Sequence, residues 1–562
     1  MEVYIILFLL IAYIMIVFSY GTREKKKQKL LLISRLKKEF GTFAIKDICL
    51  SDSPNINRFY EKLRKKTGND EVYVDDITWN DLDFDIIYEM INISNSSAGD
   101  EYLYYLLRKL EFDGSVIESN NKTIEFFQFN SEIRLKIQEI FSILGKSGKY
   151  SIVDYLDSLS SIKNRKLSEF IIGFIAMALG VIVMAYSGIV GIIILICTIC
   201  YQVIRYFSIK AEIEPYYVCF SYLNRLVNAS RRITSIECSD LADIQNEIIV
   251  VLDRMKNFEK RANNLPNAMA NMTMNPLEIM ADYINMIFHF DLIAFYKLVR
   301  LIASNKEGIN ELVLKVGKLE SFISIASFRE ALPYYSLPEF AEDNVVDNEE
   351  LYHPLLANPV ANSITTDKPV LITGSNASGK STFLKSVAIN AILAQTIGTC
   401  LTKRTRTSFF ETYSSLAIKD NIIDGDSYYL AEIKSIKRIL DASKNNEHPV
   451  LCFVDEVLRG TNAIERIAAS TQILKALSKE NIICFAATHD VELTRLLHGE
   501  YINYHFKEVV LENDIEFDYK LNIGAATSRN AIKLLQILGY DEDITEKAYQ
   551  LAEIFENTGH WE

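Results

Sequence analysis

Gly374, Gly379 and Lys380 have the spacing of residues that bind phosphate. An apolar, β-type run over residues 370–373 precedes the first glycine, four residues separate the two glycines, and a helical pattern begins after Lys380. This is the pattern G-x-x-x-x-G-K-[ST] in its strand–loop–helix setting. In such a loop the backbone N–H groups hold phosphate oxygens, and the N-terminus of the helix adds a favourable dipole.

The side chains of this loop predict a nucleotide with a metal ion. Lys380 is placed to reach the β- and γ-phosphates, and Ser381 to give its hydroxyl to Mg²⁺. We therefore expect ATP and Mg²⁺ as ligands, with ATP held by Gly374, Ser375, Asn376, Ala377, Ser378, Gly379, Lys380, Ser381 and Thr382.

Two later apolar runs end in residues that could act on the same phosphates. Residues 449–456 read P-V-L-C-F-V-D-E, so Asp455 is expected to hold Mg²⁺ through water and Glu456 to act as general base on the attacking water. Residues 482–487 lead to His489, which can face the γ-phosphate from the end of a parallel strand. Alone, His489 would be an ordinary surface histidine, but its place after the other two motifs favours a catalytic role.

The elements around these motifs predict an α/β P-loop NTPase domain over residues 341–562. Strands alternate with helices there, which is typical of a parallel sheet flanked by helices. Before it, amphipathic helical patterns over residues 78–160 and 211–338 predict an all-α region.

Several of these segments resemble the ATPase domain of the MutS family of DNA mismatch-repair proteins. They are T-G-S-N-A-S-G-K-S-T (373–382), D-E-V-L-R-G-T (455–461) and A-A-T-H-D-V-E-L-T (486–494). Residues 420–432 are similar to the family's signature segment and residues 519–539 to its C-terminal segment. The resemblance covers residues 351–562 well and the helical region before them more weakly.

The resemblance implies a homodimer in which two ATPase domains face each other. Ser427 of one subunit would approach the γ-phosphate held by the other, and His353, in the Tyr-His-Pro motif before the P-loop, would lie near the base. Asn376 would also contact phosphate. ATP would join the two domains and hydrolysis would loosen them.

Some residues depart from the family pattern. Ser375, Ala377 and Ser378 replace the usual proline, methionine and glycine, and Val457-Leu458 replace the usual Ile-Gly after the two carboxylates. Lys380 and Glu456 are kept, so hydrolysis is expected. The N-terminal half shows no segment that resembles the family's mismatch-recognition domain with its Phe-x-Glu wedge.

Two uncharged apolar stretches predict membrane spans. Residues 3–22 are long enough to cross a bilayer once, and residues 170–204, split at Ser187-Gly188, predict a helical hairpin. Lysines and arginines flank the ends that would face the cytoplasm. We therefore expect three spans in the cell membrane with a cytoplasmic ATPase domain. A buried hairpin of a water-soluble protein is the alternative.

Length and charge limit the remaining possibilities. The 562 residues suggest several domains, which we predict as 1–22 (anchor), 23–77 (cytoplasmic helical region), 78–167 and 208–340 (two parts of a MutS-like helical core), 168–207 (hairpin) and 341–562 (ATPase). The net charge of −13 means that any DNA affinity must come from a local basic patch. Cys197 and Cys200 have C-x-x-C spacing but no second pair, which argues against a zinc site.

Two functions are compatible with these sequence features. The first is a membrane-anchored MutS-like ATPase that couples ATP hydrolysis to binding of double-stranded DNA, mismatched or branched. The second is a nucleotide-driven membrane scaffold that binds proteins and no DNA. A third, an ABC transporter, is disfavoured because the sequence lacks the L-S-G-G-Q signature.

Overall fold

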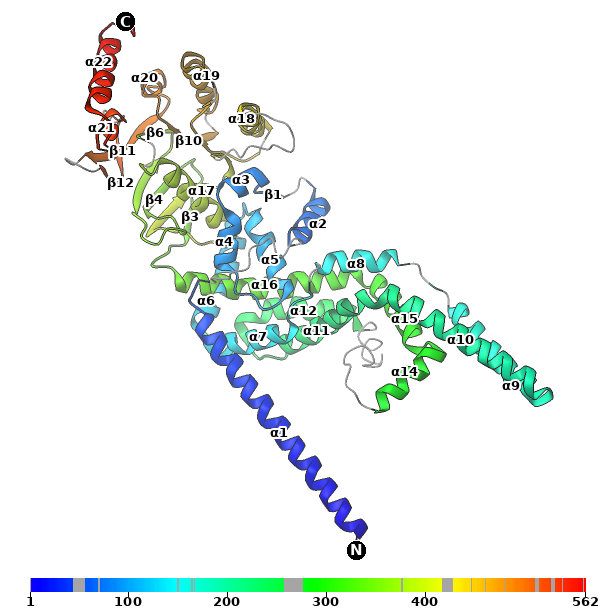
Figure 1. Ribbon diagram of the computed structural model, residues 1–562. Coiled ribbons are helices and arrows are strands. Elements are labelled where there is room, and N and C mark those ends of the chain that lie inside the picture. Colours follow the sequence, from blue (N-terminus) through cyan, green and yellow to red (C-terminus); the bar gives the residue numbers. More distant parts are fainter. Residues whose placement is uncertain are drawn as a thin grey trace. The chain divides into compact units, whose positions relative to one another are not determined.

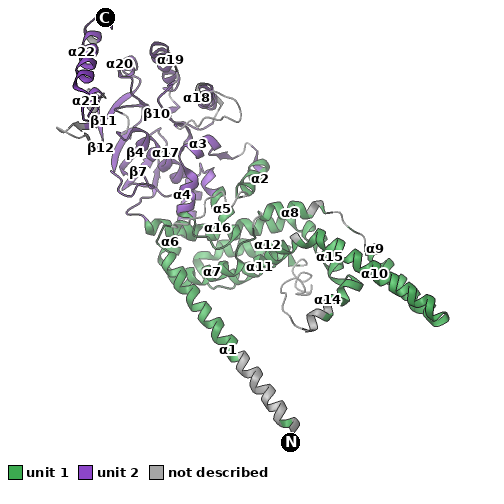
Figure 2. Ribbon diagram, in the orientation of Figure 1, with its two compact units in different colours: residues 1–66, 91–105, 123–331 green, residues 67–90, 106–122, 332–562 purple. Residues whose placement is uncertain are grey.

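The computed structural model of the chain separates into two compact units (Figure 2). Unit 1 comprises residues 1–66, 91–105 and 123–331, and unit 2 comprises residues 67–90, 106–122 and 332–562. The residues that the structure describes are 2–43, 56–68, 71–148, 151–162, 165, 167–256, 276–375, 378–416, 428–445, 447–459, 461–479, 481–510, 515–526, 531–537, 539–558 and 560–561.

Unit 1 is helical, as predicted (Figure 1). Helix α16, of 26 residues, is buried along most of its length and packs against α7, α11 and α12. Where α16 passes α5, a Cβ atom at Gly317 would lie 2.4 Å from the carbonyl oxygen of Ala98, so glycine allows the close approach. The helices are α1 (Glu2–Glu39), α2 (Asn57–Thr67), α7 (Ser131–Leu144), α8 (Ile152–Ser161), α9 (Leu167–Tyr186), α10 (Gly188–Ile213), α11 (Tyr217–Thr234), α12 (Ala242–Arg254), α14 (Pro276–Phe288), α15 (Phe290–Ser304) and α16 (Lys306–Ala331), with 3₁₀ turns at Glu214–Tyr216 and Ser239–Leu241, and with α5 (Ser97–Arg108) and α6 (Gly114–Phe129) divided between the units.

The predicted hairpin is present as α9 and α10. The chain turns at Ser187, which has an extended backbone. Helix α10 continues to Ile213, beyond the predicted end at residue 207, and its last two turns carry charged residues. Both helices are long and apolar enough to cross a membrane, and most of their residues are exposed. These are the two candidate spans among the described residues. The predicted span over residues 1–22 falls in α1, where the side chains of residues 2–3 and 5–18 are outside the described part of the chain.

Unit 2 is the predicted α/β domain. Its six-stranded sheet has the order β12-β11-β6-β10-β9-β8, in which β12 runs antiparallel to β11 and the other pairs are parallel. The strands are β6 (Val370–Thr373), β8 (Glu411–Ser415), β9 (Val450–Asp455), β10 (Ile482–Thr488), β11 (Ile502–Val510) and β12 (Ile515–Ile523).

Helices cover the sheet because its central strands are apolar on both faces. In β9, Val450, Cys452 and Val454 pack with α18 and α19, while α17 contacts β8, β9 and β10. Parallel strands buried on two sides read as continuous apolar runs, which is why the sequence identified them. The helices are α3 (Asp76–Asp81), α4 (Phe84–Ile91), α17 (Lys380–Ile397), α18 (Tyr428–Asn445), α19 (Ala463–Ala476), α20 (Glu492–Leu496), α21 (Ala531–Ile537) and α22 (Glu542–Thr558).

Two smaller sheets complete unit 2. β3 (Pro338–Phe340), β7 (Arg404–Thr407), β4 (Val346–Leu351) and β5 (Asn362–Thr366) form a four-stranded sheet in that order, and β1 (Val72–Tyr73) pairs with β2 (Lys109–Leu110). Residues 67–90 and 106–122 are part of unit 2 together with residues 332–562. The functional domain boundaries predicted at 77 and 340 stay a prediction.

Candidate nucleotide-binding site

The predicted P-loop joins β6 to α17 with the backbone that its glycines allow. Gly374 has φ +151° and Gly379 has φ +104°, a region that favours glycine. A Cβ atom at Gly374 would lie 3.0 Å from Ser378 Oγ and 3.1 Å from the Phe506 carbonyl oxygen. Both glycines are thus favoured by the backbone conformation, and a side chain at Gly374 would also crowd these two atoms.

Lys380 begins α17 and folds back over the loop. Its side chain is largely buried, and Nζ donates hydrogen bonds of 2.7 Å to the carbonyl oxygens of Gly374 and Ser375. Burial lowers the pKa of the ammonium, while the nearby carboxylates of Asp455 and Glu456 oppose that shift. The charge is therefore held at the mouth of the loop, where phosphate would bind.

Ser381 and Asp455 lie side by side, as a shared metal site requires. The Ser381 hydroxyl donates a hydrogen bond to Asp455 Oδ2. Burial raises the pKa of Asp455, and the hydrogen bond from Ser381 opposes this. Hydroxyl and carboxylate oxygens are ligands that Mg²⁺ accepts, together with phosphate oxygens and water, so the two residues fit this ion.

The structure also brings Glu456 and His489 together. Parallel pairing of β9 with β10 puts both at the same sheet edge, and His489 Nδ1 lies 3.4 Å from Glu456 Oε1. This contact lowers the pKa of Glu456, with a further contribution from Arg459, and it raises the pKa of His489. The lowered pKa keeps Glu456 ionised, as a general base must be. Arg466 holds Asp490, the neighbour of His489, by two hydrogen bonds of 3.0 Å and 2.7 Å.

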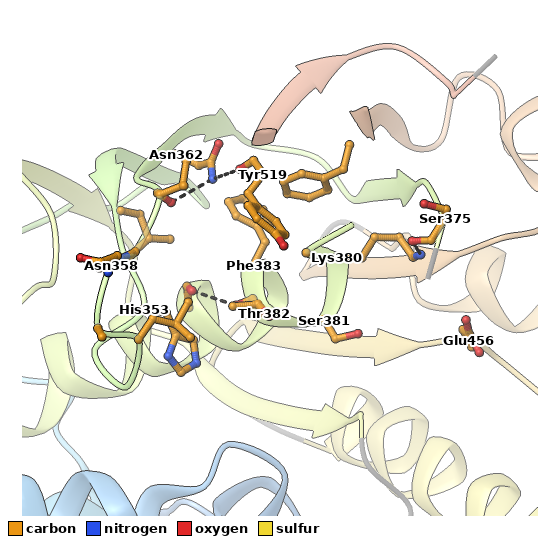
Figure 3. A pocket seen from close by; sticks show the side chains of 18 residues that line it. His353, Asn358, Asn362, Ser375, Lys380, Ser381, Thr382, Phe383, Glu456 and Tyr519 are labelled. Carbon is orange, nitrogen blue, oxygen red and sulfur yellow. Dashed lines mark hydrogen bonds between the residues drawn. The ribbon is translucent and has the colours of Figure 1, made fainter. Parts of the chain in front are cut away.

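A cavity of about 500 Å³ opens beside the P-loop (Figure 3). His353 lines it and is largely buried, and burial together with Lys385 lowers its pKa to about 4, so its imidazole is neutral. Asn362 donates a 2.9 Å hydrogen bond to the Tyr519 carbonyl oxygen and accepts one of 2.8 Å from Leu521 N. The lining residues are Leu351, His353, Leu356, Ala357, Asn358, Pro359, Val360, Asn362, Ser375, Gly379, Lys380, Ser381, Thr382, Phe383, Ser386, Glu456, Phe506 and Tyr519.

Half of the predicted site residues line this cavity, and three others lie outside the described residues. Thr382 lines it from the first turn of α17. Ser378 is buried in the loop, and its Oγ has no hydrogen-bond partner among the described residues. Asn376, Ala377 and Ser427 lie outside the described residues.

Sequence reasoning missed two parts of the site. Asn362, from β5, belongs to no motif in the sequence, and Tyr519, from β12, begins the segment that resembled the family's C-terminal segment but was not predicted to line the site. Glu432 closes the segment that resembled a family signature, yet its partner is backbone: Oε1 accepts hydrogen bonds from Leu458 N and Arg459 N, just after Glu456. Nothing in the sequence marked Glu432 for this contact.

Comparison with known proteins agrees with this geometry. Residues 370–556 match the family model described as MutS domain V. The C-terminal part of the chain is a MutS-type ATPase domain. It holds the P-loop, Asp455, Glu456 and His489, while the part of the cavity lined by residues 351–362 precedes the matched range.

Curated relatives share the same domain. The DNA mismatch repair protein MutS of Natronomonas pharaonis is 27% identical over 261 residues, which is 44% of this chain and 30% of the relative. MutS of Thermotoga maritima is 28% identical over 272 residues, 46% of this chain and 33% of the relative. The DNA mismatch repair protein msh3 of Emericella nidulans is 25% identical over 276 residues, 46% of this chain and 25% of the relative. The matches thus span about a third or less of these relatives' length.

Proposed function

We propose that the chain is a membrane-anchored MutS-type ATPase that couples ATP binding and hydrolysis to the binding of mismatched or branched double-stranded DNA. The observation that carries the ATPase part is that Lys380, Ser381 and Glu456 line one cavity, with Asp455 hydrogen-bonded to Ser381. The relatives' printed names, which are those of mismatch-repair proteins, support the DNA part.

The geometry supports a specific division of labour in hydrolysis. The loop N–H groups and Lys380 bind the phosphates, and Ser381 and Asp455 would hold Mg²⁺, which when bound supplies charge neutralisation at the phosphates. Glu456 takes a proton from the attacking water, and His489 fixes the position and ionisation of that carboxylate. The neutral His353 and the wall around Tyr519 suit an uncharged base ring.

Pairing of two ATPase domains completes the proposal. By resemblance, Ser427 of one copy would approach the γ-phosphate bound by the other, so the ATP-bound state would be a closed dimer. The proposal therefore includes a homodimer that ATP stabilises and hydrolysis opens.

The hairpin α9–α10 supports the membrane part of the proposal, because its large apolar side chains are exposed and small residues lie between its two helices, whereas a water-soluble hairpin buries its large apolar side chains. Small residues lie between the helices: a Cβ atom at Gly191 would be 2.2 Å from Met184 Cα, and one at Gly180 would be 2.9 Å from Leu195 Cδ2. Such interfaces are common between membrane helices. Large apolar side chains point outward instead, among them Ile172, Ile175, Leu179, Ile182, Ile189, Ile193, Ile196 and Ile204.

Charged residues mark where the hairpin would leave the bilayer. Arg205 contacts Glu169, and Arg165 pairs with Glu212 at 3.1 Å. Charged residues confined to one end of two otherwise uncharged helices favour a membrane boundary there. The proposed location is the cell membrane, with the ATPase domain in the cytoplasm and α1 as a third span.

The DNA part is tested by ATP hydrolysis of the full chain in lipid nanodiscs, with perfect duplex, mismatched duplex or a four-way junction. We expect stimulation that disappears at high salt, and a DNA association constant that falls linearly with salt on logarithmic axes. Hydrolysis indifferent to all three DNAs, without salt-dependent binding, would contradict it.

The second function is a nucleotide-driven membrane scaffold that binds protein partners. The net charge of −13 favours it, because strong phosphate contacts usually require a basic surface. The same experiment separates the two: the scaffold hydrolyses ATP in nanodiscs at a rate that DNA does not change.

A further inference from the structure

The turn that carries Glu456 has an unfavourable backbone. Glu456 has φ +52° and Leu458 has φ +59°, so two non-glycine residues separated by one position adopt the left-handed region. Such conformations persist where surrounding contacts determine them, and they concentrate at functional sites. The orientation of Glu456 toward the nucleotide cavity therefore depends on contacts made to the turn from outside it.

Three elements supply these contacts. Glu456 N donates to the Ala487 carbonyl oxygen of β10 at 2.9 Å, and Ser470 Oγ of α19 donates to the Val457 carbonyl oxygen at 3.1 Å. The third contact is charged: Glu432 of α18 accepts hydrogen bonds from Leu458 N and Arg459 N through one oxygen, Oε1.

Glu432 is placed unusually for a carboxylate. It is 3% exposed, its Oε2 has no hydrogen-bond partner among the described residues, and burial raises its pKa. Burying a carboxylate is unfavourable unless hydrogen bonds compensate, and here the compensating bonds go to the backbone of the turn. A hydrogen bond to an ionised acceptor is stronger than one between neutral groups.

We propose that Glu432 is a positioning residue for ATP hydrolysis. By holding the N–H groups of Leu458 and Arg459, it fixes the left-handed turn and thereby keeps the Glu456 carboxylate aimed at the attacking water. This inference rests on the proposed role of Glu456 as general base. A displacement of about 1 Å in a reacting group can lower a rate about 10²-fold, so loss of this contact acts on the chemical step and leaves ATP binding by the P-loop in place.

The first test compares Glu432→Ala and Glu432→Gln in the full chain in nanodiscs, with kcat and KM for ATP measured separately. Glutamine keeps an oxygen acceptor and alanine does not. We expect kcat to fall about 10- to 100-fold in Glu432→Ala with KM changed less than about threefold, and Glu432→Gln to keep kcat within about threefold of the original chain. Lys437→Ala, an exposed change on the same helix, should leave both constants unchanged.

The second test uses the conformation of Leu458 directly. Leu458→Gly and Leu458→Ala both remove the buried side chain, but only glycine adopts φ +59° without strain. In the Glu432→Ala background, Leu458→Gly should give a kcat at least about threefold above that of Leu458→Ala. The comparison remains informative even if Glu432→Ala alone folds poorly, because both double variants carry Glu432→Ala and differ only at position 458.

The outcomes are distinguishable. Unchanged kcat in Glu432→Ala, a Glu432→Gln variant as impaired as Glu432→Ala, or equal kcat in the two double variants would each overturn the positioning role. Glu456→Gln separates this inference from its premise: if that variant hydrolyses ATP normally, the proposed function of Glu456 fails, and if it is inactive while Glu432→Ala is normal, only the role of Glu432 fails.

Discussion

Lys380 is the side chain on which ATP binding should depend most. Its ammonium is buried over the loop and held by two loop carbonyls, so it meets phosphate without first being ordered. Replacement by alanine should lower kcat/KM for ATP by about 10²- to 10³-fold, comparable to removing one key charged donor. Nucleotide binding and hydrolysis assays measure this. Lys479→Ala, an exposed lysine distant in sequence, is the matched control, and equal loss in both variants would contradict the assignment.

The pair Glu456–His489 predicts a pH dependence. His489 has a pKa raised above its usual 6.5 by Glu456, and Glu456 has a lowered pKa. Below the pKa of His489 the imidazolium pairs with the carboxylate and weakens it as a base. As pH rises through that raised pKa the imidazole loses its charge and Glu456 becomes a stronger base, so kcat should rise with pH above the usual histidine range.

The same shift affects stability in the opposite direction. A histidine whose pKa is raised in the folded state stabilises the fold below its unfolded pKa, and this contribution is lost as pH rises through the folded pKa. His489→Ala should flatten the rise in kcat and remove this loss of stability, whereas His498→Ala should change neither. A pH–rate profile of His489→Ala identical to that of the original chain would refute the coupling.

Among single residues, the sequence predicted those whose role depends on neighbours close along the chain. Gly374, Gly379 and Lys380 act within one loop, so their order along the chain already describes the site. Glu432 could not be predicted, because its partners are backbone N–H groups contributed by a turn distant along the chain. The low pKa of His353 likewise depends on its burial in the folded domain.

At the scale of elements, α3 closes the edge of the large sheet. Asp81 accepts hydrogen bonds from Ser414 Oγ (2.7 Å) and Leu416 N (2.9 Å), and Thr78 Oγ1 accepts one from Ser414 N (3.0 Å). These contacts cover β8, an edge strand that would otherwise offer unpaired backbone groups. The helix therefore protects the ATPase domain from strand-to-strand association.

Replacing Asp81 by alanine should destabilise unit 2. The change leaves two buried donors without their acceptor, which costs about 1–3 kcal/mol. Differential scanning calorimetry of the full chain should show a lower Tm for the ATPase transition in Asp81→Ala and a smaller decrease in Asp81→Asn, which keeps an oxygen. Asn80→Ala, exposed on the same helix, should have little effect; an equal decrease there would argue against these hydrogen bonds.

The hairpin offers a pair of glycines for a similar comparison. Valine at Gly191 would force α9 and α10 apart, because its Cβ would meet Met184 Cα at 2.2 Å, whereas a Cβ at Gly188 meets no described atom within 4 Å. We expect Gly191→Val to lower the Tm in detergent and Gly188→Val to leave it nearly unchanged. Equal Tm values would show that the helices do not pack as described.

Helices and strands could be predicted where a segment is almost entirely apolar. The uncharged run from 170 to 204 predicted the hairpin and its turn, and the continuous apolar runs predicted the central strands of the sheet. The attachment of residues 67–90 and 106–122 to the ATPase unit was not predictable, because β1 and β2 pair over two residues each and the segment is held by contacts between residues far apart in sequence, such as Asp81 with Ser414. Such short strands leave no periodic pattern.

For the whole molecule, the proposed membrane anchor leads to a prediction about charge. Arginine at Ile193, which is 55% exposed on α10, would place a charge among lipid tails at a cost of about 2.5–3.5 kcal/mol. In a variant from which residues 1–22 are deleted, so that the hairpin is the remaining proposed anchor, Ile193→Arg should shift the chain from the membrane to the soluble fraction in vesicle flotation. Ile464→Arg, on α19 of the ATPase unit, should float like the original chain. Flotation unaffected by Ile193→Arg would contradict insertion of the hairpin.

The most direct test of the proposed mechanism is a single-turnover measurement of ATP hydrolysis in nanodiscs, with binding of ATP measured in the same samples. The original chain should bind and hydrolyse ATP. Glu456→Gln should bind ATP with similar affinity but hydrolyse it at least about 10²-fold more slowly, because the amide cannot accept a proton from water. Lys380→Ala should do neither. Hydrolysis by Glu456→Gln at the original rate would contradict the mechanism built on this site.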